Sequence, residues 1–464
     1  MKFIITLMLS LGFYSLFGQN IEVNSPELAA SELQKDLLFW RSKLEKKHPL
    51  IYLYRTKNEV DSIFDTSYNL LSNGASEREF YLLLLRISSF IGDGHNGIIP
   101  TQSLVNEVTH ADKLIPLEIG LSEGKLIINK NLSHSKTRLE GKQLFSINGV
   151  NHNNIIDELR SIAPREGLTP LYKAKIDHLF RFYYHLTFGI YDTYEIEYLD
   201  HNTIRNETVF GCSLDTIRSR NRDSKTPEDS NPLQFRIIDS LNTAVLTIES
   251  FDQNFLKKQY NIKFKKEIKN SFSILKEKQV KSLIIDLRGN NGGNPEFAVD
   301  ILEQVLREPF ELVAECRVVV SKSSEDFYDR TRKKWYPRYG LGSRKPRKAP
   351  FSGNIFVLID ESSFSTTVML SRALKHYNRA TLVGNETGGN PIVMGGYYIR
   401  TSWKLPNSKI TVMPSSLCTI DDDIEKNSGR GILPDITPQE GADALHFTLD
   451  MIRKKLPTTK PKPH

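Results

Sequence analysis

The chain has 464 residues and a formal net charge of +7 at pH 7, so it is long enough for about two or three domains with a sizeable core. It contains only three cysteines, which is too few for a disulfide framework and allows one disulfide at most. The positive excess is modest and no basic stripe is interleaved with aromatic residues, so nucleic acid is not expected as a partner.

The first residues have the layout of a secretory signal peptide. Lys2 precedes an apolar run over Phe3–Phe17, and Gly18 and Gln19 follow it. This run is shorter than the roughly 18 apolar residues that a membrane span requires, and no other run reaches that length. We therefore expect a signal peptide over residues 1–19, no membrane span, and a periplasmic or extracellular mature protein.

The region after the signal peptide has apolar residues at helical spacing. Helices are predicted over Ser25–Lys47, Glu59–Leu71 and Ser76–Ile91. The sequence IGDGHNGIIP follows, and its glycines permit a tight turn around one histidine. We expect residues 20–104 to form an N-terminal helical region with His95 on a loop, where it is either a surface or structurally bonded side chain or a functional one.

Short alternating runs typical of β-strands replace the helical pattern from Leu114 to about Gly211. The sequence GKQLFSINGV at Gly141–Val150 resembles the strand and turn of a PDZ domain, and a helical stretch follows it. PDZ domains add an extended peptide to a sheet edge, so the resemblance implies a peptide-binding role for residues 105–218. A small β domain without a peptide groove fits the same pattern.

The segment at residues 219–231 has no hydrophobic residue and is predicted to be a linker. After it, strands alternate with amphipathic helices: strands over Ala244–Ile248 and Ser282–Asp286, helices over Asn254–Lys278 and Glu296–Arg307. This order predicts a mostly parallel sheet with helices on its faces, so residues 232–455 should form an α/β domain. The tail at residues 456–464 has nothing to bury and is predicted to be disordered.

The segment Ile355–Pro391 has the clearest signature of a chemical site. Its apolar run Ile355–Ile359 predicts a buried strand, and the turn at Asp360–Phe364 leads into a helix that starts near Ser365. A hydroxyl at a strand-to-helix turn can act as a nucleophile, because the unpaired amides of the first helical turn can face a developing oxyanion. The same pattern also fits a serine that only caps its helix.

A glycine-rich turn, LIIDLRGNNGG at Leu283–Gly293, directly follows another buried strand. Its glycines allow close approach of the backbone and leave amides exposed, which suits a phosphate or an oxyanion. A phosphate-binding loop would continue with lysine, and no lysine follows Gly293, so an oxyanion is favoured. Asp286 and Arg288 are expected to brace the turn by pairing locally.

Together these segments resemble peptidase family S41, the family of C-terminal processing and tricorn proteases. The resemblance rests on DLRGNNGG, SSFSTT and LVGNETGG, on the earlier HP and DGH sequences, on the PDZ-like segment, and on GRGILPDI at Gly429–Ile436. It implies a secreted, tail-specific serine protease that hydrolyses polypeptides. It also implies an α/β core of the crotonase or ClpP-like type, preceded by the N-terminal helical region and the PDZ-like β domain.

By this resemblance Ser365 is the nucleophile, and Ser363 is a weaker rival. The oxyanion hole would consist of the amide of Thr366 and an amide of the pair Gly292 and Gly293. A serine needs a base to act as a nucleophile at neutral pH.

The family has two solutions for the base, a lysine after the nucleophile helix or a histidine from the N-terminal region. The lysine position falls on Asn390 here, which cannot accept a proton at neutral pH. The resemblance therefore favours His95 as the general base, since the ordinary pKa of histidine suits that role. A carboxylate should orient the histidine, and Glu425 in the acidic segment 421–425 is the predicted one.

The remaining expectations concern ligands and partners. No HExxH sequence or paired histidine spacing occurs, so neither a metal nor another cofactor is expected. Oligomeric state is not indicated. The basic segment Arg330–Lys348 precedes the nucleophile strand; it is either a solvated face or a site for acidic peptides or a terminal carboxylate. The residues predicted to bind substrate in this way are Arg344, Lys345, Arg347 and Lys348.

A non-catalytic binding protein on the same scaffold is the alternative to an enzyme. The retinoid-binding modules of the retina resemble S41 proteins, which implies that this fold can carry ligands instead of a reaction. The sequence favours the enzyme, because a nucleophile, a base and a glycine-rich turn are all present.

Overall fold

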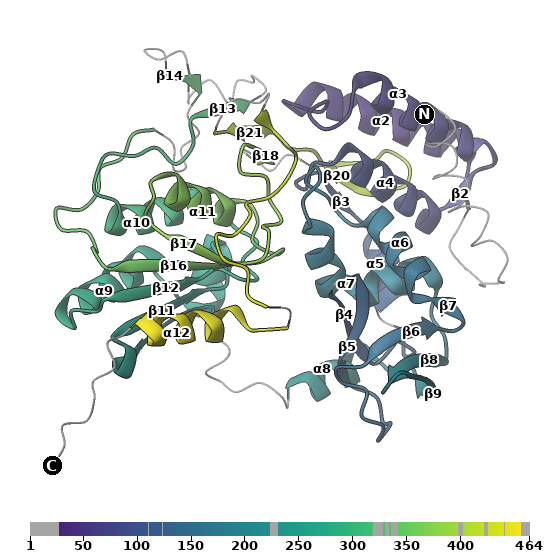
Figure 1. Cartoon of the computed structure of the whole chain (residues 1–464). Helices are drawn as coiled ribbons and strands as arrows, with labels where there is room; N and C mark the ends of the chain where they lie inside the picture. The colour runs from purple at the N-terminus through teal and green to yellow at the C-terminus, as the bar shows by residue number, and fades with distance from the viewer. Residues whose placement is uncertain are drawn as a thin grey trace. The chain divides into compact units, whose positions relative to one another are not determined.

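The structure is a computed structural model, shown in Figure 1. The described residues are 27–109, 111–122, 124–222, 231–318, 328–329, 334–335, 342–397, 402–421, 426–439 and 441–455. The predicted signal peptide and tail, and most of the predicted linker, lie outside them. The chain divides into a first unit, Met1–Gly167, Tyr172–Thr226 and Tyr397–Leu417, and a second unit, Leu168–Leu171, Pro227–Gly396 and Cys418–His464.

The first unit begins with helices close to those predicted. They are α2 (Ala30–Lys47), α3 (Lys57–Leu70) and α4 (Glu77–Ile91), with a short ribbon of β1 (Glu27–Leu28) and β2 (Ala75–Ser76) and a 3-10 turn at Leu71–Asn73. Thr56 and Ser76 each cap a helix by accepting from the amide three residues on, and glutamates return the bond. Gly92 ends α4 in a left-handed conformation (φ 85°), which opens the loop that carries His95.

An antiparallel sheet follows within the first unit. Its strands are β4 (Leu117–Ser122), β5 (Lys125–Asn131), β6 (Gln143–Ile147), β8 (Thr193–Asp200) and β9 (Thr203–Phe210), in the order β4-β5-β6-β8-β9, with β7 (Val150–Asn151) paired to β6. The helices of this region are α5 (Gln102–Thr109), α6 (His152–Ile162), α7 (Leu171–Phe188) and α8 (Leu214–Arg222).

The helices and the sheet of the first unit share one hydrophobic core. Trp40 and Phe80 of the helices belong to the same buried cluster as Leu144 and Tyr194 of the sheet. The predicted boundary between residues 20–104 and 105–218 therefore does not separate two cores.

A later segment completes the first unit. Strands β19 (Trp403–Lys404) and β20 (Thr411–Met413) form a small sheet with β3 (Gly97–Ile99), in which Met413 is opposite Gly97. Leu405, Ile410 and Val412 are buried in the core of this unit, which explains why the segment leaves the predicted range 232–455.

The second unit contains the predicted α/β core. Its sheet consists of β10 (Leu233–Ile238), β11 (Thr243–Ile248), β12 (Ser282–Asp286), β16 (Asn354–Ile359) and β17 (Thr381–Gly384), in this order. All pairs are parallel except β10 with β11. Helices α9 (Phe264–Glu277), α10 (Pro295–Val305) and α11 (Thr366–His376) cover one face, and α12 (Ala444–Lys455) covers the other (Figure 1).

Alternation along the strands explains the two covered faces. Leu283 and Ile285 of β12 belong to the cluster with α9 to α11, whereas Ile284 belongs to the cluster with α12. The predicted helix over Asn254–Lys278 is in fact interrupted. A π-helical turn at Phe255–Gln259 precedes α9, and Asn261 between them has a φ of 54°, which a continuous helix does not allow.

Smaller elements complete the second unit. They are β13 (Glu315–Val318), β18 (Val393–Gly396) and β21 (Leu417–Ile420) in one sheet, the pair β14 (Tyr328–Asp329) and β15 (Lys334–Trp335), and a 3-10 turn at Asp239–Leu241. Among the described helices, none combines the length and apolar character needed to cross a bilayer.

Candidate active site

Ser365 lies in the turn between β16 and α11 of the second unit. Its backbone has φ 56° and ψ −125°, which is costly for a residue other than glycine. Its side chain makes no capping hydrogen bond to α11. The interpretation of Ser365 as a helix cap is therefore wrong, and the strained backbone is typical of a functional position.

Asp360 holds the turn that precedes Ser365. Its carboxylate accepts hydrogen bonds from the amides of Ser363 and Gly289, each at 3.0 Å. The Ser363 hydroxyl is fully buried and donates to the Leu287 carbonyl at 3.1 Å. Ser363, the rival nucleophile, is therefore a structural residue that ties the serine turn to the glycine-rich turn.

The glycine-rich turn packs directly against Ser365. A methyl group at Gly292 would lie 2.6 Å from the Cβ of Ser365 and 2.9 Å from the amide nitrogen of Thr366, so only glycine fits there. The Phe364 amide also donates to the Asn290 carbonyl at 3.1 Å. Two segments that are far apart in the sequence thus meet, as the oxyanion prediction requires.

The amides of the glycine pair differ in what they bond. The Gly292 amide donates to the side-chain oxygen of Asn290 at 2.8 Å. Gly293 forms a parallel bridge with Phe251, in which the hydrogen bonds to Phe251 are made by the Gly292 carbonyl and the Asn294 amide. The amide and carbonyl of Gly293 itself therefore point away from Phe251. On that side the Thr366 hydroxyl donates to the Gly293 carbonyl at 2.7 Å.

Two backbone amides are consequently available beside the serine. Within the described ranges, no hydrogen-bond acceptor is found for the amide of Gly293 or for that of Thr366. Amides without an acceptor beside a serine can serve as the donors that an oxyanion needs. The arrangement favours Gly293 over Gly292 as the partner of Thr366.

Two other sequence-based interpretations concern this unit. Arg288 pairs with Asp286 at 2.7 and 2.9 Å, so the predicted brace is confirmed, and Asp443 adds a second carboxylate at 2.7 Å. Asn390 is buried, donates to Asn427 at 2.6 Å and accepts from the Ile392 amide at 2.9 Å. Asn390 orders its loop and has no basic group.

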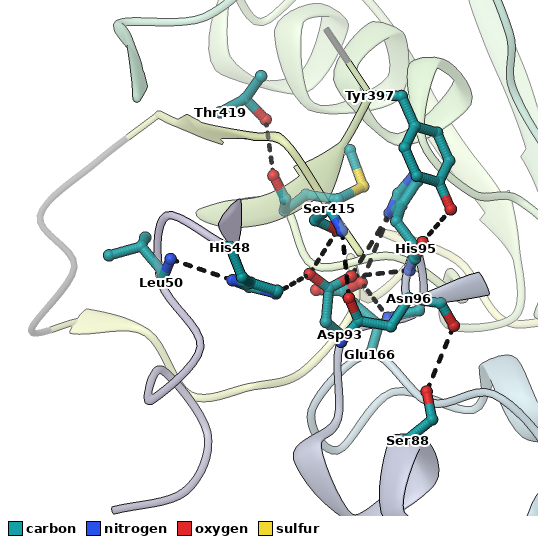
Figure 2. A network of polar contacts seen from close by, with 12 residues as sticks. His48, Leu50, Ser88, Asp93, His95, Asn96, Glu166, Tyr397, Ser415 and Thr419 are labelled. Carbon is teal, nitrogen blue, oxygen red and sulfur yellow. Dashed lines mark hydrogen bonds and ion pairs between the residues drawn. The ribbon is translucent and has the colours of Figure 1, made fainter. Parts of the chain in front are cut away.

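His95 lies in the loop between α4 and β3 of the first unit (Figure 2). Its side chain is buried, so it is not a surface residue. Its amide donates to Oδ1 of Asp93 at 2.7 Å, and its carbonyl accepts from the Tyr397 hydroxyl. The Tyr397 ring also contacts the imidazole edge to face, with centroids 5.9 Å apart. These contacts fix the loop on both sides of the imidazole.

Two buried carboxylates flank the imidazole, as Figure 2 shows. Nδ1 of His95 is 3.9 Å from Oδ1 of Asp93 and 3.9 Å from Oε2 of Glu166. Asp93 also contacts Nε2 of His48 at 2.6 Å and accepts from the Ser415 hydroxyl at 2.7 Å. None of Glu166, His48 and Ser415 was a predicted site residue.

Burial dominates the ionisation of this cluster. It lowers the pKa of His95 to about 4, although the charge of Asp93 works in the other direction. Burial, with the charge of Asp93, raises the pKa of Glu166 well above its ordinary value. Burial also acts to raise the pKa of Asp93, but the interaction with His48 outweighs it and holds that pKa below its ordinary value.

The same cluster is the one to test for a metal ion. Asp93, His95 and Glu166 offer ligand atoms within 4.8 Å of one another, the only such group in the part of the chain that is described. Each oxygen of the two carboxylates already accepts a hydrogen bond from the protein. Because these oxygens are already engaged in hydrogen bonds, the geometry does not favour a metal centre.

The other predicted site residues are placed as follows. Glu425 lies outside the described residues. Arg344 pairs with Glu296 at 2.9 Å and Arg347 pairs with Glu303 at 3.0 Å, both on α10. Lys345 and Lys348 are exposed.

The edge strand β4 bears on the PDZ-like prediction. The Leu121 amide donates to the carboxylate of Asp177, and Arg181 donates to the carbonyls of Ile115 and Leu117 at 2.8 and 3.1 Å. Side chains of α7 thus occupy backbone groups that an added peptide strand would need. A cavity of about 390 Å³ lies between β4 and α7 and offers space beside this edge.

Comparison with known proteins identifies the class. Residues 242–437, which span both glycine-rich stretches and Ser365, match the model of peptidase family S41. The chain carries an S41 peptidase domain. It is a serine peptidase, as the sequence predicted.

Solved structures of the protease CPAF share the fold of this chain. Mature CPAF is 15% identical, with a TM-score of 0.67, over 92% of this chain and 97% of that one. CPAF complexed with lactacystin gives 15% identity and a TM-score of 0.66, over 92% and 98%. The photosystem II D1 C-terminal processing protease has 14% identity and a TM-score of 0.43, over 89% of this chain and 94% of that one. No curated sequence matches the chain.

Proposed function

We propose that this peptidase hydrolyses polypeptides through an acyl-enzyme on Ser365, with His95 as the general base. The observation that carries the proposal is the meeting of the two turns. Gly292 packs against Ser365 while the Thr366 hydroxyl holds Gly293, so two amides lie beside a serine with a strained backbone. This combination supports an oxyanion hole made by Thr366 and Gly293.

The reaction follows from these roles. His95 takes the proton of the Ser365 hydroxyl as the oxygen bonds to the substrate carbonyl carbon, and the amides of Thr366 and Gly293 stabilise the oxyanion. His95 then gives the proton to the leaving amine as the carbon–nitrogen bond breaks. A water molecule, activated by His95, hydrolyses the ester and restores the serine.

Three predictions from the sequence remain part of the proposal. Glu425 is the acid predicted from the family resemblance. The N-terminal signal implies export to the periplasm or beyond, and the PDZ-like sheet with a tail-specific preference implies recognition of an extended peptide end. Cell fractionation together with sequencing of the mature N-terminus tests the export, and a start near Asn20 is expected.

A fluorophosphonate probe tests the mechanism, because it labels only an activated serine. The full chain should be labelled at Ser365, and Ser365→Ala should lose the label together with peptide hydrolysis. Ser363→Ala is the matched control, since it removes a neighbouring hydroxyl whose bonds are to Asp360 and to the Leu287 carbonyl. It should keep the label and lose roughly 1 kcal/mol of stability.

The contrary outcomes are clear. Labelling that persists in Ser365→Ala but disappears in Ser363→Ala would move the nucleophile to Ser363. Folded wild-type protein that takes no label and cleaves no peptide would favour the non-catalytic binding protein.

A further inference from the structure

The two carboxylates beside His95 are equally distant from its Nδ1 but are bonded differently. Asp93 accepts from three donors: the His95 amide, the Ser415 hydroxyl and His48. Glu166 accepts from the Gly94 amide at 3.0 Å and contacts the Tyr54 hydroxyl at 2.9 Å. A carboxylate that accepts more hydrogen bonds is better stabilised in its charged form.

The bonds of His48 define its protonation. The Leu50 amide donates to Nδ1 of His48 at 3.1 Å, so Nδ1 carries no proton. The proton of the neutral ring is then on Nε2, which donates to Asp93 at 2.6 Å. His48 thus stabilises the Asp93 carboxylate without contributing a positive charge. The negative charge of Asp93 remains available to another group.

Glu166 is placed to carry a proton. Its partner Tyr54 has a hydroxyl that can donate or accept, so that contact survives when Glu166 is protonated. Two carboxylates close together in a buried site do not both stay ionised, because their negative charges repel each other. Glu166 has fewer hydrogen-bond donors than Asp93, so Glu166 is the one expected to be protonated. Burial and the charge of Asp93 raise the pKa of Glu166, in agreement with this assignment.

We propose that Asp93 is the counter-ion of the His95 imidazolium and that Glu166 is a neutral positioning residue. The inference rests on the proposed function of His95 as the base. When His95 accepts the serine proton, the new positive charge forms beside one ionised carboxylate in a buried site. Glu166 meanwhile holds the Gly94 amide, and the Gly167 amide bonds the Gly92 carbonyl at 2.8 Å, so the loop keeps its shape.

The other groups that face His95 make this counter-ion necessary. Burial and then the charge of Lys175 on α7 act to lower the pKa of His95. The uncharged ring of Tyr397 contacts the imidazole edge to face, and Glu166 provides the second carboxyl group beside it. Asp93 is therefore the one negative charge among these groups, if Glu166 is neutral as inferred.

Isosteric variants of the full chain separate the two carboxyl groups. Asp93→Asn should lower kcat by roughly 100-fold or more with little change in KM, because it removes the charge that stabilises the imidazolium in the transition state. It should also move the acidic limb of the pH–rate profile to lower pH. Glu166→Gln exchanges one neutral group for another, so it should keep kcat within about fivefold and leave the limb unmoved. Glu425→Gln is measured in parallel.

Each other outcome overturns the inference. A downward shift of the limb in Glu166→Gln would make Glu166 the ionised partner, and this test does not depend on whether Asp93→Asn folds. A folded Asp93→Asn protein with wild-type kcat, beside a large loss in Glu425→Gln, would return the role to Glu425. NMR titration of the His95 ring in wild type and Glu166→Gln makes the same comparison without activity. Failure of the probe to label wild type would instead count against the proposed function.

Discussion

The serine turn of the second unit and the histidine loop of the first are held by different kinds of contact. Around Ser365 the contacts are mainly made by backbone groups, a glycine and one threonine hydroxyl, and the Asp360 carboxylate holds the turn through backbone amides. Around His95 they are made by side chains, among them a buried carboxylate and a second histidine. The first kind of site depends on close approach of the backbone, and the second depends on which buried groups carry charge.

This difference predicts how each part fails. A bulkier side chain should damage the serine turn at any pH, because the amides lose their positions. Acid should damage the histidine loop, because protonation changes the charges that orient it. Variants and pH therefore test the two parts separately.

The largest effect is expected from removing the base. His95→Ala should lower kcat by about 10³-fold or more, within the range seen for general bases in acyl transfer. Asn390→Ala is the matched control for the lysine branch of the family. It loses the contact with Asn427 and some stability, but the chemistry should survive. Peptide hydrolysis by folded His95→Ala at close to the wild-type rate would send the search for the base to lysines such as Lys404.

The next largest effect tests the backbone of the serine turn. A Cβ at Gly293 would meet the Phe251 carbonyl carbon at 2.1 Å, so Gly293→Ala must displace the strand that presents its amide. Loss of one oxyanion donor lowers kcat by about 10²-fold or more. Gly289→Ala is the control, because its φ of 76° is also unusual but no atom lies within 4 Å of the added methyl. It should cost only about 1 kcal/mol of stability. Equal kcat values in the two variants would contradict the proposed oxyanion hole.

A smaller and graded effect is expected from pH. His95 must be neutral to accept a proton, and burial lowers its pKa to about 4, so kcat/KM should fall as pH drops through that region. Between the unfolded pKa near 6.5 and the folded value, the unfolded chain binds the additional proton, so the His95 contribution to stability should decline on acidification. Denaturant titrations and rate profiles of wild type measure both. A limb near pH 6.5 would show that His95 is not desolvated in the working enzyme.

The serine turn could be predicted from the sequence because its parts are local. Ser365 follows an apolar strand and precedes a helix, and the glycines of Leu283–Gly293 directly predict a turn. Several contacts join the two segments, among them Gly292 against Ser365 and the bond from the Thr366 hydroxyl to the Gly293 carbonyl. The family resemblance predicted that the two turns meet. The α/β core was likewise predictable from the alternation of strands and helices.

The histidine loop could not be predicted in the same way. Glu166 and the residues that bond the two carboxylates beside His95 come from segments around residues 48, 54, 166 and 415, and no spacing in the sequence links them. Only the HP dipeptide at His48 and the aspartate of DGH were signals, and neither indicated a shared hydrogen bond. Residues 397–417 belong to the first unit because apolar side chains of this segment, such as Leu405 and Val412, are buried in its core. Long-range packing of this kind has no local pattern.

The smallest expected effect concerns the basic segment before β16. Arg344 and Arg347 are already paired with Glu296 and Glu303, so the exposed Lys345 and Lys348 are the ones able to attract a substrate carboxylate. Exposed charges contribute about 1 kcal/mol or less, which corresponds to a change of at most about fivefold. Replacing both lysines by serine should reduce the preference for a peptide with a free C-terminus over its amide by that factor. Arg344→Ser, the control, should lower stability slightly and leave the preference unchanged. If wild type itself cleaves the acid and the amide equally, the segment is a solvated face and binds no terminal carboxylate.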